Sequence, residues 1–171
     1  REKTSRGDDT GEGVDAMRIS ILTLFPEMFT GFLSSSIIKR AIEKKLVQFD
    51  IVNIRDFSKL NNQQVDDTPY GGGPGMVMMV EPVVEAIRSV KTEKSHIIFL
   101  TPSGKTFKES KAKEYARREH LILICGHYEG IDERILYYID EEVSIGDYVL
   151  TGGELPSMVV ADAVVRLIDG V

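Results

Sequence analysis

From residue 17 onward, stretches with the two-residue period of a β-strand alternate with stretches of helical period in this 171-residue chain. The expected strands cover residues 18–25, 49–54, 96–101, 121–125 and 143–145. The expected helices cover residues 26–46, with a break near 34–36, and residues 81–90, 107–118, 131–138 and 155–168. The length suits about one domain of ~100 to 200 residues. This alternation predicts an α/β fold in which helices cover both faces of a parallel sheet.

Composition narrows the classes of protein that fit this fold. Lys and Arg number 21 against 27 Asp and Glu, so the net charge is −6, and nucleic acid would need a local basic patch to bind. The single cysteine, Cys125, excludes an internal disulfide and is typical of a reducing compartment. Apolar runs stay far below the ~20 residues of a membrane-spanning helix. We therefore expect a cytoplasmic protein that does not enter a membrane.

Residues 1–16 differ in composition from the rest of the chain. They hold five acidic and three basic residues and three glycines, with almost nothing apolar. This composition suits neither a signal peptide nor a packed segment. We expect a disordered leader or a remnant of cloning, followed by one domain over residues 17–171 whose natural start is Met17.

Three glycine-bearing loops follow the expected third, fourth and fifth strands, over residues 102–106, 126–130 and 146–156. In parallel α/β sheets the ligand lies beyond the carboxyl ends of the strands. Glycine lets the backbone approach a ligand closely, and backbone amides can then recognise a flat heterocycle. Any one of these glycines could simply form a tight turn, but the three loops together predict a pocket.

Residues 99–106 end in the Gly-Lys-Thr of a phosphate-binding loop. The motif also needs a glycine where Phe99 stands, and Pro102 removes a backbone amide from the cradle. A P-loop-like nucleotide-hydrolysing protein is therefore the weaker alternative. The glycine string 71–76 likewise fails the dinucleotide fingerprint, because Met76 replaces its third glycine.

The nucleophilic and metal-binding candidates are few. Cys125 ends an apolar strand, where a free cysteine usually packs in the core. His127 and Glu129 have the spacing of a zinc deaminase, but the cysteine pair such enzymes need downstream is missing. His96 and His120 begin strands, and we expect both on the surface. The sequence predicts no metal site.

Basic residues gather between Lys105 and Arg118, where six bases and two acids give a local net charge of +4. The run is either a solvated helix face or a contact to a phosphate backbone. Its bases are Lys105, Lys108, Lys111, Lys113, Arg117 and Arg118.

The last expected helix is apolar nearly all round, which is typical of a helix buried in the core or between subunits. Its charged residues, Asp162 and Arg166, are four apart with the acid first, an order that favours an ion pair on one face. The alternative is that Arg166 delivers a cation to a pocket.

Four strings carry a family resemblance: LFPEMF at residues 24–29, DDTPYGGGPGM at 66–76, CGHYEGIDER at 125–134 and SIGDYVLTGGELP at 144–156. They closely resemble the bacterial tRNA (guanine-N1)-methyltransferase family, and the resemblance runs over residues 17–171. It implies an S-adenosylmethionine-dependent enzyme that methylates N1 of the guanine 3′ of the anticodon, at tRNA position 37. It also implies the SPOUT fold, whose sheet domain contains a deep C-terminal trefoil knot, an exception to the rule against threaded chains.

The resemblance further implies a homodimer with its active site at the subunit interface. Arg166 matches the arginine that acts on the target guanine. The residues implied to bind S-adenosyl-L-methionine are Leu100, Thr101, Pro102, Gly126, Tyr128, Glu129, Ile145, Gly146, Asp147, Tyr148, Val149, Leu150, Gly152, Gly153 and Pro156.

The chemistry accounts for these parts. The sulfonium is already a good leaving group, so much of catalysis is orientation of donor and acceptor. The ring nitrogen of guanine carries a proton that a base must remove, while a cation, here Arg166, stabilises the charge that develops on the neighbouring oxygen.

The chain departs from the family pattern at two places. The usual base is an aspartate in a linker beyond the last helix, followed by a small domain that grips tRNA, and the chain stops at Val171 before both. Neither Asp162 nor Asp169 matches that aspartate. We therefore expect this chain to bind the cofactor but to be nearly inactive, and a natural gene product to continue further. His127 stands where some members have arginine, and we expect it to affect only a tRNA or surface contact. A catalytically silent RNA-binding module is the remaining alternative.

Overall fold

The computed structural model describes residues 15–59, 66–67, 77–127 and 131–171. Its main sheet has the strand order β2-β1-β6-β5-β7, and every neighbouring pair is parallel. The strands are β1 (Met17–Thr23), β2 (Val47–Asn53), β5 (Ser95–Thr106), β6 (His120–Cys125) and β7 (Glu141–Ser144). Two short strands, β3 (Asp66–Asp67) and β4 (Val77–Met78), pair in antiparallel fashion as a separate sheet. The predicted parallel sheet is confirmed.

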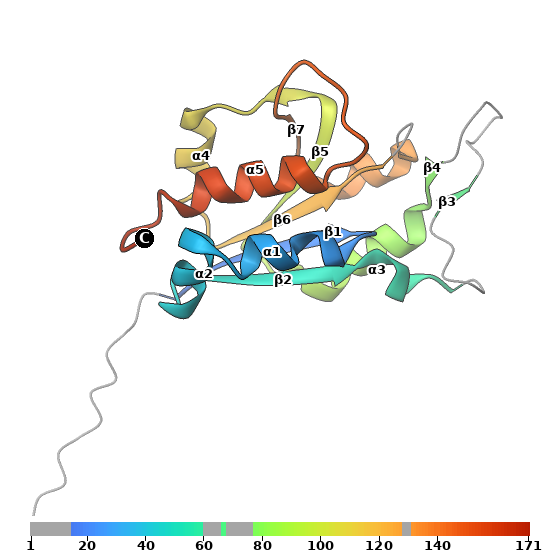
Figure 1. Cartoon of the computed structure of the whole chain (residues 1–171). Coiled ribbons are helices and arrows are strands. Elements are labelled where there is room, and N and C mark those ends of the chain that lie inside the picture. Colours follow the sequence, from blue (N-terminus) through green and yellow to red (C-terminus); the bar gives the residue numbers. More distant parts are fainter. Residues whose placement is uncertain (1–14, 60–65, 68–76, 128–130) are drawn as a thin grey trace, which may run out of the picture.

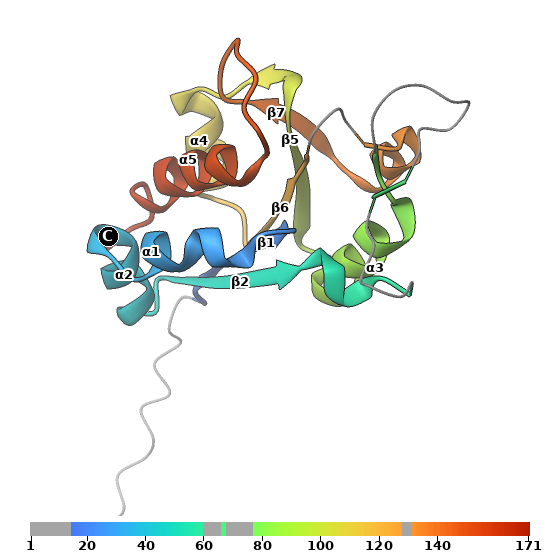
Figure 2. The ribbon, with the colours of Figure 1, turned by 45° about the vertical axis from the view of Figure 1, so that its right-hand side comes forward.

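Helices cover both faces of this sheet, as the alternation of periods predicts (Figure 1, Figure 2). The group α1, α2, α4 and α5 lies on one face, and α3 lies on the other with the 3₁₀ helices η2 and η4. Their bounds, with η1 included, are η1 (Pro26–Phe29), α1 (Thr30–Leu33), α2 (Ser36–Glu43), η2 (Ile54–Phe57), α3 (Val80–Val90), α4 (Glu109–Tyr115), η4 (Glu133–Tyr138) and α5 (Glu154–Val165). None of the helices in the described ranges has the length and apolar character needed to span a bilayer.

Strand β6 shows why the sheet has two cores. All of its side chains are buried, and they alternate between the faces with the two-residue period of a strand. Leu121, Leu123 and Cys125 belong to the core beneath α5, whereas Ile122 and Ile124 belong to the core beneath α3. A continuous apolar run is what a central parallel strand requires.

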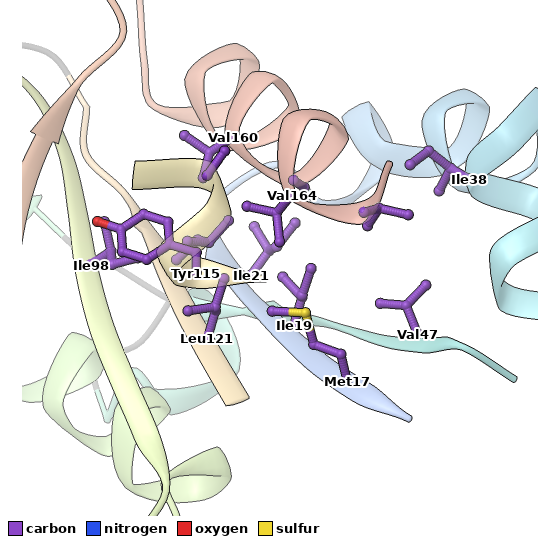
Figure 3. Packing of buried hydrophobic residues seen from close by; sticks show 14 of the residues in the cluster. Met17, Ile19, Ile21, Ile38, Val47, Ile98, Tyr115, Leu121, Val160 and Val164 are labelled. Atoms are coloured by element: carbon purple, nitrogen blue, oxygen red, sulfur yellow. The ribbon is translucent and has the colours of Figure 1, made fainter. Parts of the chain in front are cut away.

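Helix α5 is held on the sheet by its inner face (Figure 3). Val160 and Val164 are fully buried and point toward Ile19 and Ile21 of β1. Burying each such aliphatic side chain contributes about 1.5–3 kcal/mol. The packing fixes the helix, and therefore also fixes the start of the helix at Glu154, where the preceding loop arrives.

Several predicted helices differ from the observed ones in their bounds or type. The helix expected over 107–118 is only α4, because Lys108 is extended and precedes it. The segment expected as a helix over 131–138 is the 3₁₀ helix η4, which a periodic pattern cannot distinguish from an α-helix over so few residues. The stretch over 26–46 divides near the expected break, where Ser35 is extended and Ser36 has a φ of 55°.

The string that resembles a phosphate loop is part of a strand. Strand β5 continues to Thr106, and both Leu100 and Lys105 pair with Val143, so residues 101–104 form a bulge. The backbone is close enough that a Cβ on Gly104 would lie 2.5 Å from the amide nitrogen of Val143. A phosphate loop passes directly into a helix. Because both ends of this string are paired in a sheet and α4 begins only at Glu109, the P-loop hypothesis was wrong.

Two histidines expected on the surface are not there. His120 is 3% exposed, and its ring nitrogens lie 2.8 Å from Ser20 Oγ and 2.6 Å from Ser95 Oγ. His96 is half-buried, with Nε2 2.8 Å from Glu141 Oε2. Both side chains face neighbouring strands. Their polar partners are therefore distant in sequence, and the sequence pattern around each histidine does not reveal them.

Candidate functional site

A pocket lies at the carboxyl ends of β6 and β7, beside the bulge of β5. Its cavity volume is about 90 Å³, and it opens to solvent. The lining residues are Phe99, Leu100, Thr101, Pro102, Gly126, His127, Val143, Ser144, Ile145, Gly146, Tyr148, Val149, Leu150, Gly152, Gly153 and Pro156. The glycine-bearing loops after β6 and β7 therefore share one hollow, and the expected first loop contributes to it as the bulge of β5, through Pro102.

Most residues that the resemblance implied for the donor are among this lining. Asp147 is the exception within the described part of the chain. Tyr128 and Glu129 lie outside the described residues. Phe99, His127, Val143 and Ser144 line the pocket without having been predicted to bind the donor. The rule that ligands lie at the carboxyl ends of parallel strands could have identified them. Each lies at, next to or just beyond the carboxyl end of a segment in which a strand pairs with a neighbouring strand.

Two consecutive glycines bring the loop before α5 against the end of β6. A Cβ on Gly153 would lie 2.7 Å from the Cα of Cys125, and the amide of Gly153 donates to the carbonyl of Gly126 over 2.8 Å. Gly152 forms an antiparallel bridge with His127. Only glycine allows this backbone approach. Two loops that are separate in sequence are thereby joined into one wall of the pocket.

The lining is almost uncharged. Among the described residues that form it there is no Asp, Glu, Lys or Arg. Polar groups come from the backbone and from hydroxyls such as that of Ser144, whose Oγ donates to the carbonyl of Gly146 over 2.8 Å. Such a surface suits a ligand with a flat heterocycle, recognised by backbone hydrogen bonds.

His127 is buried, so the prediction that it affects only a tRNA or surface contact was wrong. It is 9% exposed, and its Nε2 lies 2.9 Å from each carboxylate oxygen of Glu154. Glu154 is 2% exposed and also accepts a hydrogen bond of 2.8 Å from the hydroxyl of Thr23. Sequence reasoning missed Glu154 and Thr23, since their contact joins residues 131 positions apart.

Arg166 lies away from the pocket of its own chain. It follows the last residue of α5, is exposed, and its guanidinium lies 3.5 Å from Glu109 Oε1. The expected ion pair with Asp162 is replaced by this contact with α4. Only the backbone of Asp162 meets Arg166, as the acceptor of its amide hydrogen.

The outer face of α5 is exposed in the single chain, so the helix is not wholly buried in the core of one chain, and its burial between subunits stays a prediction. Leu155 and Val159 are 51% and 46% exposed, and Asp162 and Arg166 are exposed as well. These residues are spaced by three or four positions and therefore share one helical face. The apolar residues behind them face the core, so in a single chain the helix has one buried and one open face.

The basic run is divided by the fold. Lys111 forms ion pairs with Glu141 at 3.0 Å and Glu114 at 3.1 Å, and these contacts raise its pKa. Lys113 and Arg117 line a hollow of about 920 Å³ at the amino ends of the strands, far from the pocket. Acidic Glu119 and Asp169 line the same hollow, so its charge is mixed.

Cys125 is fully buried, and burial raises the pKa of its thiol. Its Sγ lies 3.5 Å from Ser157 Oγ. A protonated, inaccessible thiol is a poor nucleophile, which confirms that this cysteine packs in the core. Within the described ranges no three His, Cys, Asp or Glu residues are grouped as metal ligands would be.

Comparison with known proteins decides the family. The model of the family described as tRNA (Guanine-1)-methyltransferase TrmD matches residues 17–171. This chain belongs to the TrmD family. Its parallel sheet covered by helices on both faces is consistent with that family's SPOUT fold, and the trefoil knot stays a prediction.

Curated relatives in the TrmD family are similar over most of this chain. Proteins named tRNA (guanine-N(1)-)-methyltransferase from Mycoplasma capricolum and Clostridium botulinum are 54% and 57% identical over 156 residues, which is 91% of this chain and 65% of each relative. The protein of the same name from Malacoplasma penetrans is 56% identical over 155 residues, covering 91% of this chain and 69% of the relative. The chain thus spans about two thirds of the length of these relatives.

Proposed function

We propose that this chain holds the methyl donor of an enzyme that transfers a methyl group from S-adenosylmethionine to N1 of guanine 37 in tRNA. The single observation that carries the proposal is the pocket, in which the glycine-bearing loops after β6 and β7 and the bulge of β5 form one hollow in a member of the TrmD family. Because the proposed substrate is tRNA, we expect the activity in the cytoplasm.

The lining fits such a donor. An adenosine moiety needs a flat, mostly apolar slot and a few hydrogen-bonding groups, and the pocket offers aliphatic side chains, hydroxyls and closely approaching backbone. A side-chain methyl on Gly126 would lie 2.6 Å from the ring of Phe99, so the pocket floor tolerates no larger residue there. Bound in this place, the donor would supply an activated methyl group.

The position of Arg166 supports a site made by two chains. Within one chain, α5 separates this guanidinium from the pocket. The same exposed face of α5 carries Leu155 and Val159, an apolar surface that a second copy would cover. A twofold homodimer would place Arg166 of one copy near the pocket of the other, with its cation directed at the oxygen of the target guanine.

The test is titration calorimetry of the folded protein with S-adenosylmethionine and with S-adenosylhomocysteine, together with methyl transfer to tRNA by a form of the protein that supports turnover. We expect saturable binding of both ligands and one methyl group on N1 of guanine 37. Lack of saturable binding by the folded dimer would contradict the proposal. Binding of tRNA with an empty pocket would instead favour a silent RNA-binding module.

A further inference from the structure

A buried chain of polar side chains lies directly behind the donor pocket. It runs from Thr23 at the end of β1, through Glu154 at the start of α5, to His127 after β6. His127 and Gly152 also line a neighbouring hollow of about 240 Å³ together with Phe25 and Leu155. His127 and Gly152 therefore line both cavities, and Glu154 lines the second.

The direction of each hydrogen bond follows from the groups. A carboxylate can only accept, so Nε2 of His127 carries the hydrogen that points at Glu154, 2.9 Å from each oxygen. The hydroxyl of Thr23 donates to Glu154 Oε1 over 2.8 Å and accepts from the amide of Phe25 over 2.9 Å. The carboxylate lies in the first turn of α5, where the helix dipole favours a negative charge.

The same contacts surround the loop that forms one wall of the pocket. A Cβ on Gly152 would lie 2.5 Å from the His127 ring and 2.7 Å from Glu154 Oε2, so this glycine lies tightly against the pair. The bridge between His127 and Gly152 and the bond from the Gly153 amide to the Gly126 carbonyl complete the junction. The loop is thereby packed directly against the contact between His127 and Glu154.

We propose that His127 and Glu154 are positioning residues, whose contact holds the Gly152–Gly153 segment in the conformation that binds the methyl donor. The proposal rests on the proposed function for the identity of the donor. Neither side chain needs to touch the reacting atoms. His127 also lines the pocket, but the proposed effect passes through the backbone of the two glycines, so it must appear in the exchange of the Gly153 amide without ligand.

Removal of the imidazole N–H has a defined consequence. Of these two donors, His127 and Thr23, the buried carboxylate of Glu154 would keep only the hydroxyl of Thr23. A buried carboxylate with too few hydrogen bonds raises the free energy of the folded conformation. The neighbouring hollow offers it a route toward water. As the carboxylate turns, the first turn of α5 and Gly153 loosen, and donor affinity falls.

The experiment compares His127→Leu, which lacks the N–H, with His127→Gln, which restores one. We expect S-adenosylhomocysteine to bind about tenfold more weakly to the leucine variant, the loss for one charge-assisted hydrogen bond, and the glutamine variant to recover part of the affinity. Amide hydrogen exchange of Gly153, measured without ligand, should be faster in the leucine variant at matched global stability. Glu154→Gln keeps the shape and an acceptor, so it serves if His127→Leu does not fold, with an expected loss of about threefold.

The matched control is His96→Leu. His96 forms a contact of the same kind with Glu141, at 2.8 Å, but neither residue lines the pocket. This variant should lose stability while donor affinity and Gly153 exchange stay as in the parent protein. Equal donor affinity and equal Gly153 exchange in parent and His127→Leu would overturn the positioning role. A parent protein that binds no donor would instead refute the proposed function, and the exchange measurement would still test whether the pair holds the loop.

Discussion

Gly153 and Arg166 stand at opposite ends of α5, one in the wall of the pocket and the other exposed beyond the last turn. At a rise of 1.5 Å per residue the helix separates them by roughly 20 Å. The side chain of Arg166 is too short to reach a ligand in the pocket of its own chain. The separation makes the proposed two-chain site directly testable.

Mixing two inactive variants should restore activity. Gly146→Leu adds bulk beside the exposed ring of Tyr148 and should block the pocket, while Arg166→Ala removes the cation. In a random mixture half of the dimers are mixed, and each holds one intact pocket opposite one intact arginine, so we expect about a quarter of the parental rate. Methyl transfer to tRNA measures this, with both variants co-expressed in a form of the protein that supports turnover. Recovery no greater than the sum of the two separate variants would refute a shared site.

In a form of the protein that supports turnover, Arg166→Ala alone should lower turnover by at least about a hundredfold, as loss of a donor to a developing oxyanion does. Affinity for S-adenosylhomocysteine should stay nearly unchanged, because Arg166 does not line the pocket. Steady-state kinetics and calorimetry on the same preparation separate the two quantities. Equal losses in both would indicate a structural role through the contact with Glu109.

Gly153→Ala should destabilise the fold as well as the pocket. The added methyl would meet the backbone of Cys125 at 2.7 Å, and backbone cannot move aside cheaply, so we expect a loss of about 1–3 kcal/mol in the free energy of unfolding. Gly31→Ala is the control, because nothing lies within 4 Å of its added methyl in α1. That variant should gain about 0.5–1 kcal/mol from helix propensity. Urea denaturation compares them, and equal stabilities would contradict the close approach.

His120 should make stability depend on pH near neutrality. Desolvation by burial lowers its pKa below 6.5, and the nearby positive charge of Arg18 acts in the same direction. The unfolded chain therefore binds the proton first as pH falls, so stability is complete above pH 6.5 and decreases as pH falls toward the folded pKa. Denaturation at pH 7.5 and at about pH 5.5 should show a smaller difference for His120→Gln than for the parent. An unchanged difference would show that other groups control this range.

Charge reversal in the basic run should separate a tRNA contact from an ion pair. Lys108 and Arg117 are exposed, and Lys108→Glu with Arg117→Glu should weaken tRNA binding and reduce its salt dependence by about one unit of slope per lost phosphate contact. Lys111→Ala should instead lower stability by up to about 1 kcal/mol, because its ammonium pairs with Glu141 and Glu114. Exposed Lys91, at the end of α3, provides the control reversal Lys91→Glu. Unchanged tRNA affinity in the double variant would identify the run as a solvated surface.

The pattern of the sequence determined the order of the elements and the place of the pocket. Alternating periods predicted the parallel sheet with helices on both faces, and the glycine-bearing loops at 126–130 and 146–156 were correctly expected to supply a shared hollow. These features are local, since each strand, turn or helix is encoded by residues a few positions apart. The family resemblance also rests on contiguous strings.

Only the tertiary structure decided which polar residues are buried together. Thr23 meets Glu154 across 131 positions, and His120 meets Ser20 across 100, because neighbouring strands and the helix that covers them come from distant parts of the chain. The same holds for Arg166, whose partner Glu109 lies on another helix. A hydrogen bond forms only when donor and acceptor are placed to within a few tenths of an ångström of the right distance. The periodicity of a sequence carries no information of that kind.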